Sequence, residues 1–252
     1  MYQSLIKPLF ADIKKFTLNV LFPIRCVVCE KEGLFLCADC QNKLTPLPLQ
    51  YCVACQKTSP FGLTHPKCIS PHTADALVSI FDYHDENVGK IIIAGKYKFI
   101  PAIFEILGNL IAKKFVDGYP SILSEPYTLT PIPLHSWRKR WRGFNQAEIL
   151  SQTIGKELNL LCTTVLVRCH WTMTQKNLKK ERRLLNVRNA FALSPKILRP
   201  CLAGRQAKSE ILNQNFILVD DVCTTGATLA EAARVLKRNG ADKVICLTVA
   251  RD

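Results

Sequence analysis

Residues 216–228 read Phe-Ile-Leu-Val-Asp-Asp-Val-Cys-Thr-Thr-Gly-Ala-Thr, and this stretch decides the fold of the 252-residue chain. The four apolar residues at its start form a short run with two β-branched members, which is typical of a buried parallel strand. Residues 229–239 then follow a helical pattern. The stretch therefore predicts a strand, a small loop and a helix in succession.

The loop of this unit is suited to a phosphorylated sugar. Three threonines, at positions 224, 225 and 228, offer hydroxyls, and Gly226 lets the backbone approach an anion closely. The first N–H groups of the following helix are unpaired and attract negative charge. The helix dipole contributes only about 0.3–1 kcal/mol, so several loop contacts must add to it. Asp220 and Asp221 come just before the loop, which would place their carboxylates about one sugar length from a bound phosphate. At that distance they suit two ribose hydroxyls or a hydrated magnesium ion.

The rest of the C-terminal region alternates between strand and helix patterns. Such alternation predicts a mostly parallel sheet covered by helices on both faces, with ligands at the carboxyl ends of the strands. We expect strands at residues 76–81, 127–133, 165–167, 216–220 and 244–249, and helices at 88–94, 101–115, 144–158 and 229–239, with Asn145 as a helix cap.

Composition and charge indicate a globular protein with a polyanionic partner. Hydrophobic residues make up 48% of the chain, and no apolar run approaches the roughly 20 residues of a membrane span. Residues 1–25 predict an amphipathic helix without a signal-peptide core, so we expect a cytoplasmic protein. The formal net charge is +14, and residues 138–199 hold 14 Lys and Arg against three Glu. This density favours a polyanionic partner, either a phosphorylated sugar, single-stranded nucleic acid or both, with plain solvated surface charge as the alternative.

Cysteine pairs predict metal sites near the N-terminus. Cys26, Cys29, Cys37 and Cys40 form two CxxC pairs at a separation typical of a tetrahedral zinc site. A disulfide framework is the alternative, but reducing conditions in the cytoplasm disfavour it.

A second unit follows at Cys52, Cys55, His65 and Cys68, where the histidine occupies the position of a cysteine. His72 is an alternative ligand there, and a metal-free unit is another. Both metals would be structural, because so short a segment has too little core to fold alone.

Residues 131–146 read Pro-Ile-Pro-Leu-His-Ser-Trp-Arg-Lys-Arg-Trp-Arg-Gly-Phe-Asn-Gln and combine basic with aromatic side chains. Arginine forks bind phosphate oxygens in a bidentate manner. Trp137, Trp141 and Phe144 either stack on bases or pack in the core. A second charged segment, residues 175–191, is either a lid over the site or a solvated surface helix.

Together these strings resemble the competence protein F (ComF/GntX) family, in which a zinc ribbon precedes a type I phosphoribosyltransferase-like domain. The resemblance covers almost the whole chain. It rests on the cysteine pairs after Pro23, Lys96-Tyr97, Pro131–His135, Arg142–Gln146, Glu181-Arg182-x3-Asn186-Val187 and residues 219–228. The chain departs from the family at His65, where cysteine is more usual.

The resemblance implies an α/β fold, with a type I phosphoribosyltransferase-like parallel sheet flanked by helices at residues 73–252. It implies a small N-terminal zinc-ribbon region at residues 26–72, after the helix at 1–25. Asp220 and Asp221 would contact the ribose 2′- and 3′-hydroxyls of phosphoribosyl pyrophosphate (PRPP), with Mg²⁺ accompanying the ligand. The 5′-phosphate would lie against Thr224, Thr225, Gly226, Ala227 and Thr228. The candidates for phosphate or DNA contact are Lys96, Arg138, Arg140, Arg142, Asn145, Gln146 and Arg182.

The family is associated with natural transformation, so the resemblance implies a cytoplasmic protein that handles incoming single-stranded DNA. The zinc ribbon would help to hold this DNA or a partner such as the uptake helicase. The alternative is an active phosphoribosyltransferase that acts on an unidentified base or amine, and a PRPP-sensing regulator is a third possibility. Purine salvage is disfavoured, because Thr224 stands where those enzymes carry an acidic general base.

Overall fold

The structure is a computed structural model that describes residues 23–120, 122–169, 189–195, 197 and 211–252. The chain divides into two compact units, residues 1–44 and residues 45–252. The amphipathic helix expected at residues 1–25 lies almost entirely outside the described residues. The same holds for Arg182 and most of the segment at 175–191.

The described part of the first unit is a small loop-rich body. Its first turn is closed by hydrogen bonds from Cys26 N to Lys31 O and from Glu30 N to Cys26 O, both 2.9 Å. Arg25 pairs with Glu32 across this turn at 2.9 Å. One short helix, α2 (Ala38–Asn42), carries Cys40 into the buried centre.

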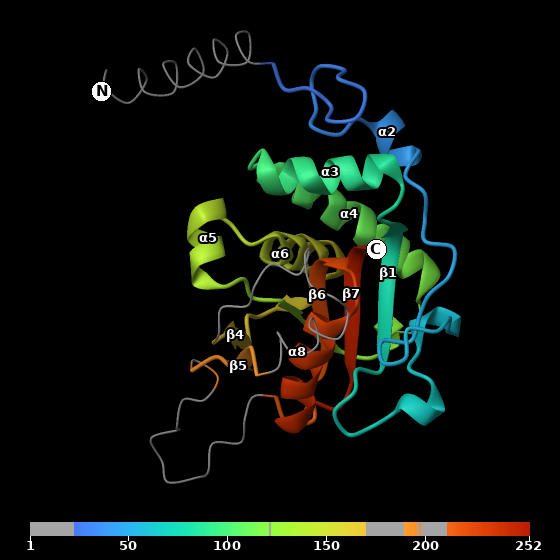
Figure 1. Cartoon of the computed structure of the whole chain (residues 1–252), viewed down its shortest axis with the longest axis vertical. Helices are drawn as coiled ribbons and strands as arrows, with labels where there is room; N and C mark the ends of the chain where they lie inside the picture. Colours follow the sequence, from blue (N-terminus) through green and yellow to red (C-terminus); the bar gives the residue numbers. More distant parts are fainter. Residues whose placement is uncertain (1–22, 121, 170–188, 196, 198–210) are drawn as a thin grey trace. The chain divides into compact units, whose positions relative to one another are not determined.

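The second unit is built on a five-stranded sheet in the order β1-β7-β6-β2-β3, with every pairing parallel. Figure 1 shows β1, β7 and β6 of this sheet side by side. The sheet confirms the α/β class expected from the sequence. In the middle of β6, Leu218 pairs with Thr130 of β2 and Cys246 of β7. The strands are β1 (Ala76–Asp82), β2 (Tyr127–Pro131), β3 (Leu161–Cys162), β6 (Asn215–Cys223) and β7 (Val244–Arg251).

Helices cover both faces of this sheet. Gly155 of α6 lies so close to β2 that an added Cβ would stand 3.2 Å from Leu129 Cδ1. Leu129 pairs with Ile217 and shares its face, whereas the next residue, Leu218, clusters with α8. Successive strand residues point to opposite faces, so α6 and α8 flank the sheet on opposite sides. In the part of this unit that the structure describes, the α-helices are α3 (Glu86–Tyr97), α4 (Pro101–Gly118), α5 (Ser136–Arg142), α6 (Gln146–Leu158) and α8 (Ala227–Arg238).

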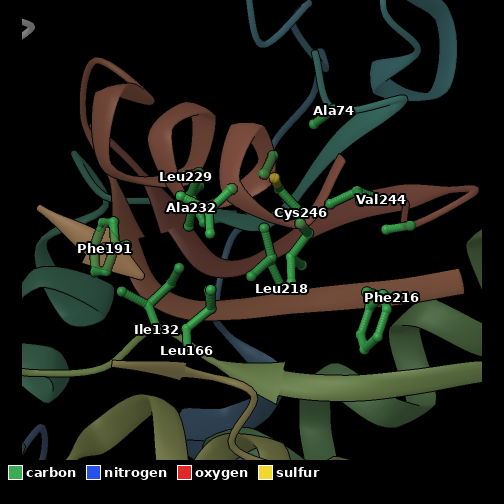
Figure 2. Close-up of a cluster of buried hydrophobic side chains, with 14 of the residues drawn as sticks. Ala74, Ile132, Leu166, Phe191, Phe216, Leu218, Leu229, Ala232, Val244 and Cys246 are labelled. Atoms are coloured by element: carbon green, nitrogen blue, oxygen red, sulfur yellow. The ribbon is translucent and has the colours of Figure 1, made fainter. Parts of the chain in front are cut away.

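A two-stranded antiparallel sheet, β4 (Leu166–Arg168) and β5 (Phe191–Leu193), packs over the α8 side. Figure 2 shows Phe191 and Leu166 in one buried cluster with Ile132, Leu229 and Ala232. This packing fixes the end of β4 near the carboxyl ends of the main strands. The described residues also contain three short 3-10 turns, at Pro60–Gly62, Pro66–Cys68 and Ile122–Ser124.

Most of the expected elements occur, and the differences have identifiable physical causes. The strand expected at residues 216–220 continues to Cys223, because its pairing with β7 extends from Phe216 to Cys223. The arginine-rich segment after Pro133 forms helix α5, with His135 Nδ1 accepting from Trp137 N at 3.3 Å. Asn145 caps α6 as predicted, accepting from Ala147 N at 3.2 Å.

Candidate functional site

A cavity of about 370 Å³ lies at the carboxyl ends of the central strands in the second unit. Its walls come from the ends of β2, β6 and β7, the start of α8, the end of α3, and helix α5. Parallel strands place their carboxyl ends at one edge, so segments distant in sequence meet here.

Asp220 and Asp221 both line this cavity, at the end of β6. The Asp220 carboxylate accepts a hydrogen bond from Asp221 N at 2.9 Å. Burial by the cavity walls raises the pKa of Asp220 to about 7, and the adjacent negative charge of Asp221 adds to this effect. Asp220 is therefore partly protonated near neutral pH.

Lys96 faces the second carboxylate. Its ammonium group lies 2.8 Å from Asp221 Oδ2, and both side chains are largely buried. Lys96 belongs to the last turn of α3, so this ion pair joins α3 to β6. A candidate for phosphate contact is thus paired with one of the two acids in the unliganded protein.

The loop that follows β6, Thr224–Thr228, is referred to below as the threonine loop. Gly226 adopts a left-handed conformation with φ of +72°, which a residue with a side chain would rarely tolerate. This turn aims the first residues of α8 into the cavity, where Ala227 and Thr228 line the wall beside Thr224. Thr225 does not line the cavity, and its hydroxyl accepts from Ala227 N at 3.4 Å.

The opposite wall is basic. Arg138 and Arg142 come from α5, and Arg168 comes from β4. Burial lowers the pKa of both Arg142 and Arg168, because the cavity withdraws them from water. Desolvated guanidinium groups favour an anionic ligand that can accept their hydrogen bonds.

Gln146 adds a polar donor to the same cavity. It is only 2% exposed, and its Nε2 has no hydrogen-bond partner among the described residues. A buried amide without a partner is costly, so it marks a position for a ligand acceptor. Asn145, next to it, has a structural role in this conformation, donating to Ile132 O at 3.0 Å and capping α6. Arg140 is exposed and does not line the cavity.

Exposed aromatic rings gather beside the cavity. The aromatic cluster consists of Tyr97, Phe99 and Trp141, with Trp141 centred 6.4 Å from Tyr97 and 5.3 Å from Phe99. Each ring is close to half exposed. The Arg142 guanidinium lies over both Tyr97 and Trp141, at 5.8 and 5.9 Å from the ring centroids. Phe144, the third aromatic that the sequence offered for stacking, instead packs against Phe104 at 6.0 Å.

The first cysteine cluster, in the first unit, fits a zinc ion. The ligand atoms of Cys26, Cys29, Cys37 and Cys40 all lie within 4.8 Å of one another. Burial alone would raise the pKa of Cys26, but backbone N–H groups donate to its sulfur and the net effect lowers it to about 6. Burial and the neighbouring thiols raise the pKa of Cys40 to about 12. Four thiols this close to one another influence each other's protonation, and a divalent cation bound to the four sulfurs would displace their protons.

The second cluster, in the second unit, comprises Cys52, Cys55, His65 and Cys68, and its ligand atoms also lie within 4.8 Å. His65 Nδ1 lies 3.2 Å from Cys55 Sγ, while its Nε2 lies 3.1 Å from Thr58 O. A histidine ligand usually donates its other ring N–H to such a carbonyl. Within the described residues the cluster includes His65 and not His72.

Several described residues of the cavity region were not identified from the sequence, among them Tyr83, Arg168 and Phe99. Tyr83 and Arg168 line the wall but belong to no recognisable motif. Phe99 follows Lys98 at the end of α3 and joins the aromatic cluster through its position, with φ of +56°. Only the antiparallel pairing of β4 with β5 brings Arg168 to the site, and the pattern of residues 165–167 does not specify that partner.

Comparison with known proteins agrees with this architecture. Residues 142–252 match the phosphoribosyl transferase domain, and residues 17–69 match the double zinc ribbon domain. The chain is 28% identical over 239 residues to Competence protein F of Haemophilus influenzae, covering 91% of this chain and 98% of that protein. It is 35% identical over 183 residues to DNA utilization protein YhgH of Escherichia coli K12, covering 71% and 73%. It is 26% identical over 240 residues to Competence protein ComFC of Bacillus subtilis, covering 85% and 89%.

The parallel sheet and these matches define a phosphoribosyltransferase-type domain preceded by a double zinc ribbon. The similar proteins named above are competence and DNA utilization proteins. The chain belongs to the competence protein F/ComFC family. Among the described residues, no helix is long and apolar enough to cross a membrane.

The two cysteine clusters predict two zinc ions per chain. We expect Cys29→Ser to remove one ion and His65→Ala to remove the other, because each change deletes one ligand of a four-ligand set. Metal analysis of the purified protein by inductively coupled plasma mass spectrometry measures this directly. Cys169→Ser, an exposed cysteine outside both clusters, should keep both ions. A wild-type content of one zinc that His65→Ala leaves unchanged would contradict the second site.

Proposed function

We propose that this protein binds PRPP with Mg²⁺ in the cavity at the end of β6 and handles single-stranded DNA during natural transformation. The observation that carries the proposal is the meeting of two carboxylates, a helix N-terminus and desolvated arginines in one cavity. PRPP offers the matching groups, since it joins ribose hydroxyls to a 5′-phosphate and a pyrophosphate. The names of the relatives, which refer to competence and DNA utilization, support the second half of the proposal.

Each part of the ligand has a suitable partner. The ribose hydroxyls would donate to Asp220 and Asp221, and the 5′-phosphate would accept from the N–H groups of the threonine loop. The pyrophosphate would lie toward Arg138 and Arg142, whose forks suit phosphate oxygens. Mg²⁺ would be held by the carboxylates, water and the phosphates of the ligand, and would neutralise part of their charge.

Ligand binding at Asp221 must either break the ion pair between Lys96 and Asp221 or rearrange it. In the free protein the Lys96 ammonium group neutralises Asp221 at 2.8 Å. A ribose hydroxyl would then donate a hydrogen bond to the Asp221 carboxylate, while the Lys96 ammonium group turns toward a phosphate of the ligand. The ion pair therefore keeps a buried acid paired until the ligand arrives.

A second candidate function is phosphoribosyl transfer to a base or amine. The observation that favours it is Gln146, whose buried Nε2 has no partner among the described residues. An amide N–H in this position would orient the phosphoribosyl acceptor by donating a hydrogen bond to its carbonyl oxygen or ring nitrogen. In such a transfer the bond from ribose C1 to pyrophosphate breaks, a bond to the acceptor nitrogen forms, and the acceptor loses a proton. Pyrophosphate release in the presence of candidate acceptors distinguishes transfer from binding alone.

Single-stranded DNA is proposed to lie along α5 and the aromatic cluster. Four of the seven residues of α5 are Arg or Lys, which provides phosphate contacts. The half-exposed rings of Phe99 and Trp141 offer stacking platforms for bases, which suit any sequence because every base has a π face. We place this activity in the cytoplasm, where thiols stay reduced and both cysteine clusters can hold metal.

The pKa of Asp220 predicts a pH dependence of PRPP binding. A folded-state pKa raised to about 7 means that the proton is bound more tightly in the folded protein than in the unfolded chain. The folding stability that this protonation contributes is thus lost as the pH rises through about 7, where the buried carboxyl group ionises. A ligand that donates hydrogen bonds to the ionised carboxylate stabilises the folded protein again. We expect the affinity for Mg²⁺–PRPP to rise about tenfold between pH 6 and pH 8, as measured by calorimetry.

The phosphates of PRPP also titrate in this range, so a variant isolates the contribution of the protein. Asp220→Asn should flatten the part of the pH profile that belongs to Asp220, and Asp220→Asn/Asp221→Asn should abolish binding. Asp242→Asn, on the surface away from the cavity, should retain the wild-type profile. Wild-type affinity in the double variant would reject this site.

DNA binding should depend on salt and on the aromatic cluster. Each phosphate contact on a single strand contributes about −0.7 to the slope of log K against log salt concentration, so several contacts give a steep decline. Trp141→Ala should weaken binding of an oligothymidine by about 1–3 kcal/mol, because one base loses its stacking partner. Fluorescence anisotropy at several salt concentrations measures both effects.

Two phenylalanines provide a matched comparison. Phe99 and Phe61 are both exposed and both have positive φ, at +56° and +53°. Phe61 instead contacts Tyr119 and lies outside the aromatic cluster. Phe99→Ala should weaken DNA binding, whereas Phe61→Ala should not. Equal losses in both variants, or an affinity indifferent to salt, would count against this surface.

A further inference from the structure

The two CxxC turns share a backbone feature immediately after their second cysteine. Glu30 and Gln56 occupy equivalent positions, and both have φ of +62°. In each turn the N–H of this residue donates to the carbonyl of the first cysteine, Cys26 at 2.9 Å or Cys52 at 3.0 Å. Residues other than Gly, Asn and Asp seldom take this conformation. The metal-binding turn therefore fixes the direction in which the side chain leaves.

In the second turn that side chain reaches the threonine loop. Gln56 Nε2 donates to Val53 O at 2.6 Å, and its Oε1 accepts from the Arg251 guanidinium. A Cβ added to Gly226 would stand 3.3 Å from Gln56 Nε2 and 3.7 Å from Val53 O. The left-handed glycine that aims α8 at the cavity thus lies directly against the metal-binding turn.

Arg251 holds the other side of the same contact. It ends β7, is only 9% exposed, and pairs in register with Cys223 at the base of the loop. Its guanidinium lies over the Tyr51 ring at 4.3 Å, beside Cys52. The next residue, Asp252, donates its N–H to Cys223 O at 2.9 Å. The base of the loop is therefore held between the end of β7 and the residues around Cys52.

We propose that Gln56 and Arg251 form a brace through which the second metal cluster positions the threonine loop. With Cys52 and Cys55 held by a metal ion, the turn presents the Gln56 amide at a fixed place, and the amide fixes Arg251 and the wall behind Gly226. Release of that ion frees the turn, and the loop loses its support. The metal site thereby regulates phosphate binding at a cavity to which it contributes no ligand.

The consequence for binding rests on the proposed PRPP function, whereas the brace itself does not. Coupling between two sites is reciprocal, so a phosphate ligand in the loop would also slow the loss of metal from the second cluster. Residues that orient metal ligands without touching the metal typically alter metal affinity or activity by 10–100-fold, and we expect an effect at the lower end of this range for a residue that orients a phosphate-binding loop. Gln56 is in this sense a positioning residue.

The test uses the full-length zinc-loaded protein and the variant Gln56→Ala. Hydrogen–deuterium exchange of peptides covering residues 223–230 reports on the loop without any ligand. Calorimetry with Mg²⁺–PRPP reports on binding, and metal analysis confirms the zinc content. We expect Gln56→Ala to keep its zinc, to exchange faster in this segment, and to bind PRPP about tenfold more weakly.

Gln50→Ala is the matched control. Gln50 is also an amide near the second cluster, but it joins β1, with Nε2 donating to Ser79 O and Oε1 accepting from Ser79 N, both at 2.9 Å. This variant should lower stability without changing loop exchange or PRPP affinity. Gln56→Glu keeps an acceptor for Arg251 but loses the donor to Val53 O, so its loop exchange should lie between that of Gln56→Ala and that of wild type.

The outcomes separate the brace from the proposed function. Loop exchange in zinc-loaded Gln56→Ala equal to that of wild type overturns the brace. Faster loop exchange in His65→Ala supports the link to the metal, and unchanged exchange there overturns it. A wild-type protein that fails to bind PRPP rejects the proposed function, and the exchange measurements still decide on the brace.

Discussion

Strand β6 is hydrogen-bonded in parallel on both sides, to β2 and to β7, and the site depends on this arrangement. Parallel pairing places the carboxyl ends of the three strands at one edge of the sheet. Asp220 and Asp221 lie in the last part of β6, the segment leading to α5 follows β2, and Arg251 ends β7. A shift of one residue in the register of β6 would turn Leu218 away from α8 and reverse the faces of both carboxylates.

The same arrangement explains why the cavity holds charges of both signs. Asp220, Asp221 and Lys96 meet Arg138, Arg142 and Arg168 in a space that removes much of their hydration. Burial raises the pKa of Asp220 and lowers that of Arg142 and Arg168, so each group gains from a partner of complementary character. A sugar phosphate supplies both kinds of partner, with hydroxyls that donate and phosphates that accept.

The sequence predicted what depends on local pattern and missed what depends on tertiary contact. The apolar run of β6, the cap at Asn145 and the cysteine spacings are visible in the chain itself, and the structure places them as expected. Arg168 and Phe99 reach the site only through pairing and packing of distant segments. The sequence offered Phe144 as a residue that could stack on a base, but in the structure its ring packs against Phe104. The link from Gln56 to Gly226 spans 170 residues, and no motif encodes it.

The most direct measurement for the whole account is a crystal structure of the protein with Mg²⁺ and PRPP. We expect the 5′-phosphate within hydrogen-bond distance of the backbone N–H groups of residues 224–228, and the ribose hydroxyls on Asp220 and Asp221. Lys96 should then have moved from Asp221 toward a phosphate. Electron density for the ligand elsewhere, with the ion pair of Lys96 and Asp221 intact and the threonine loop without a phosphate, would contradict the account.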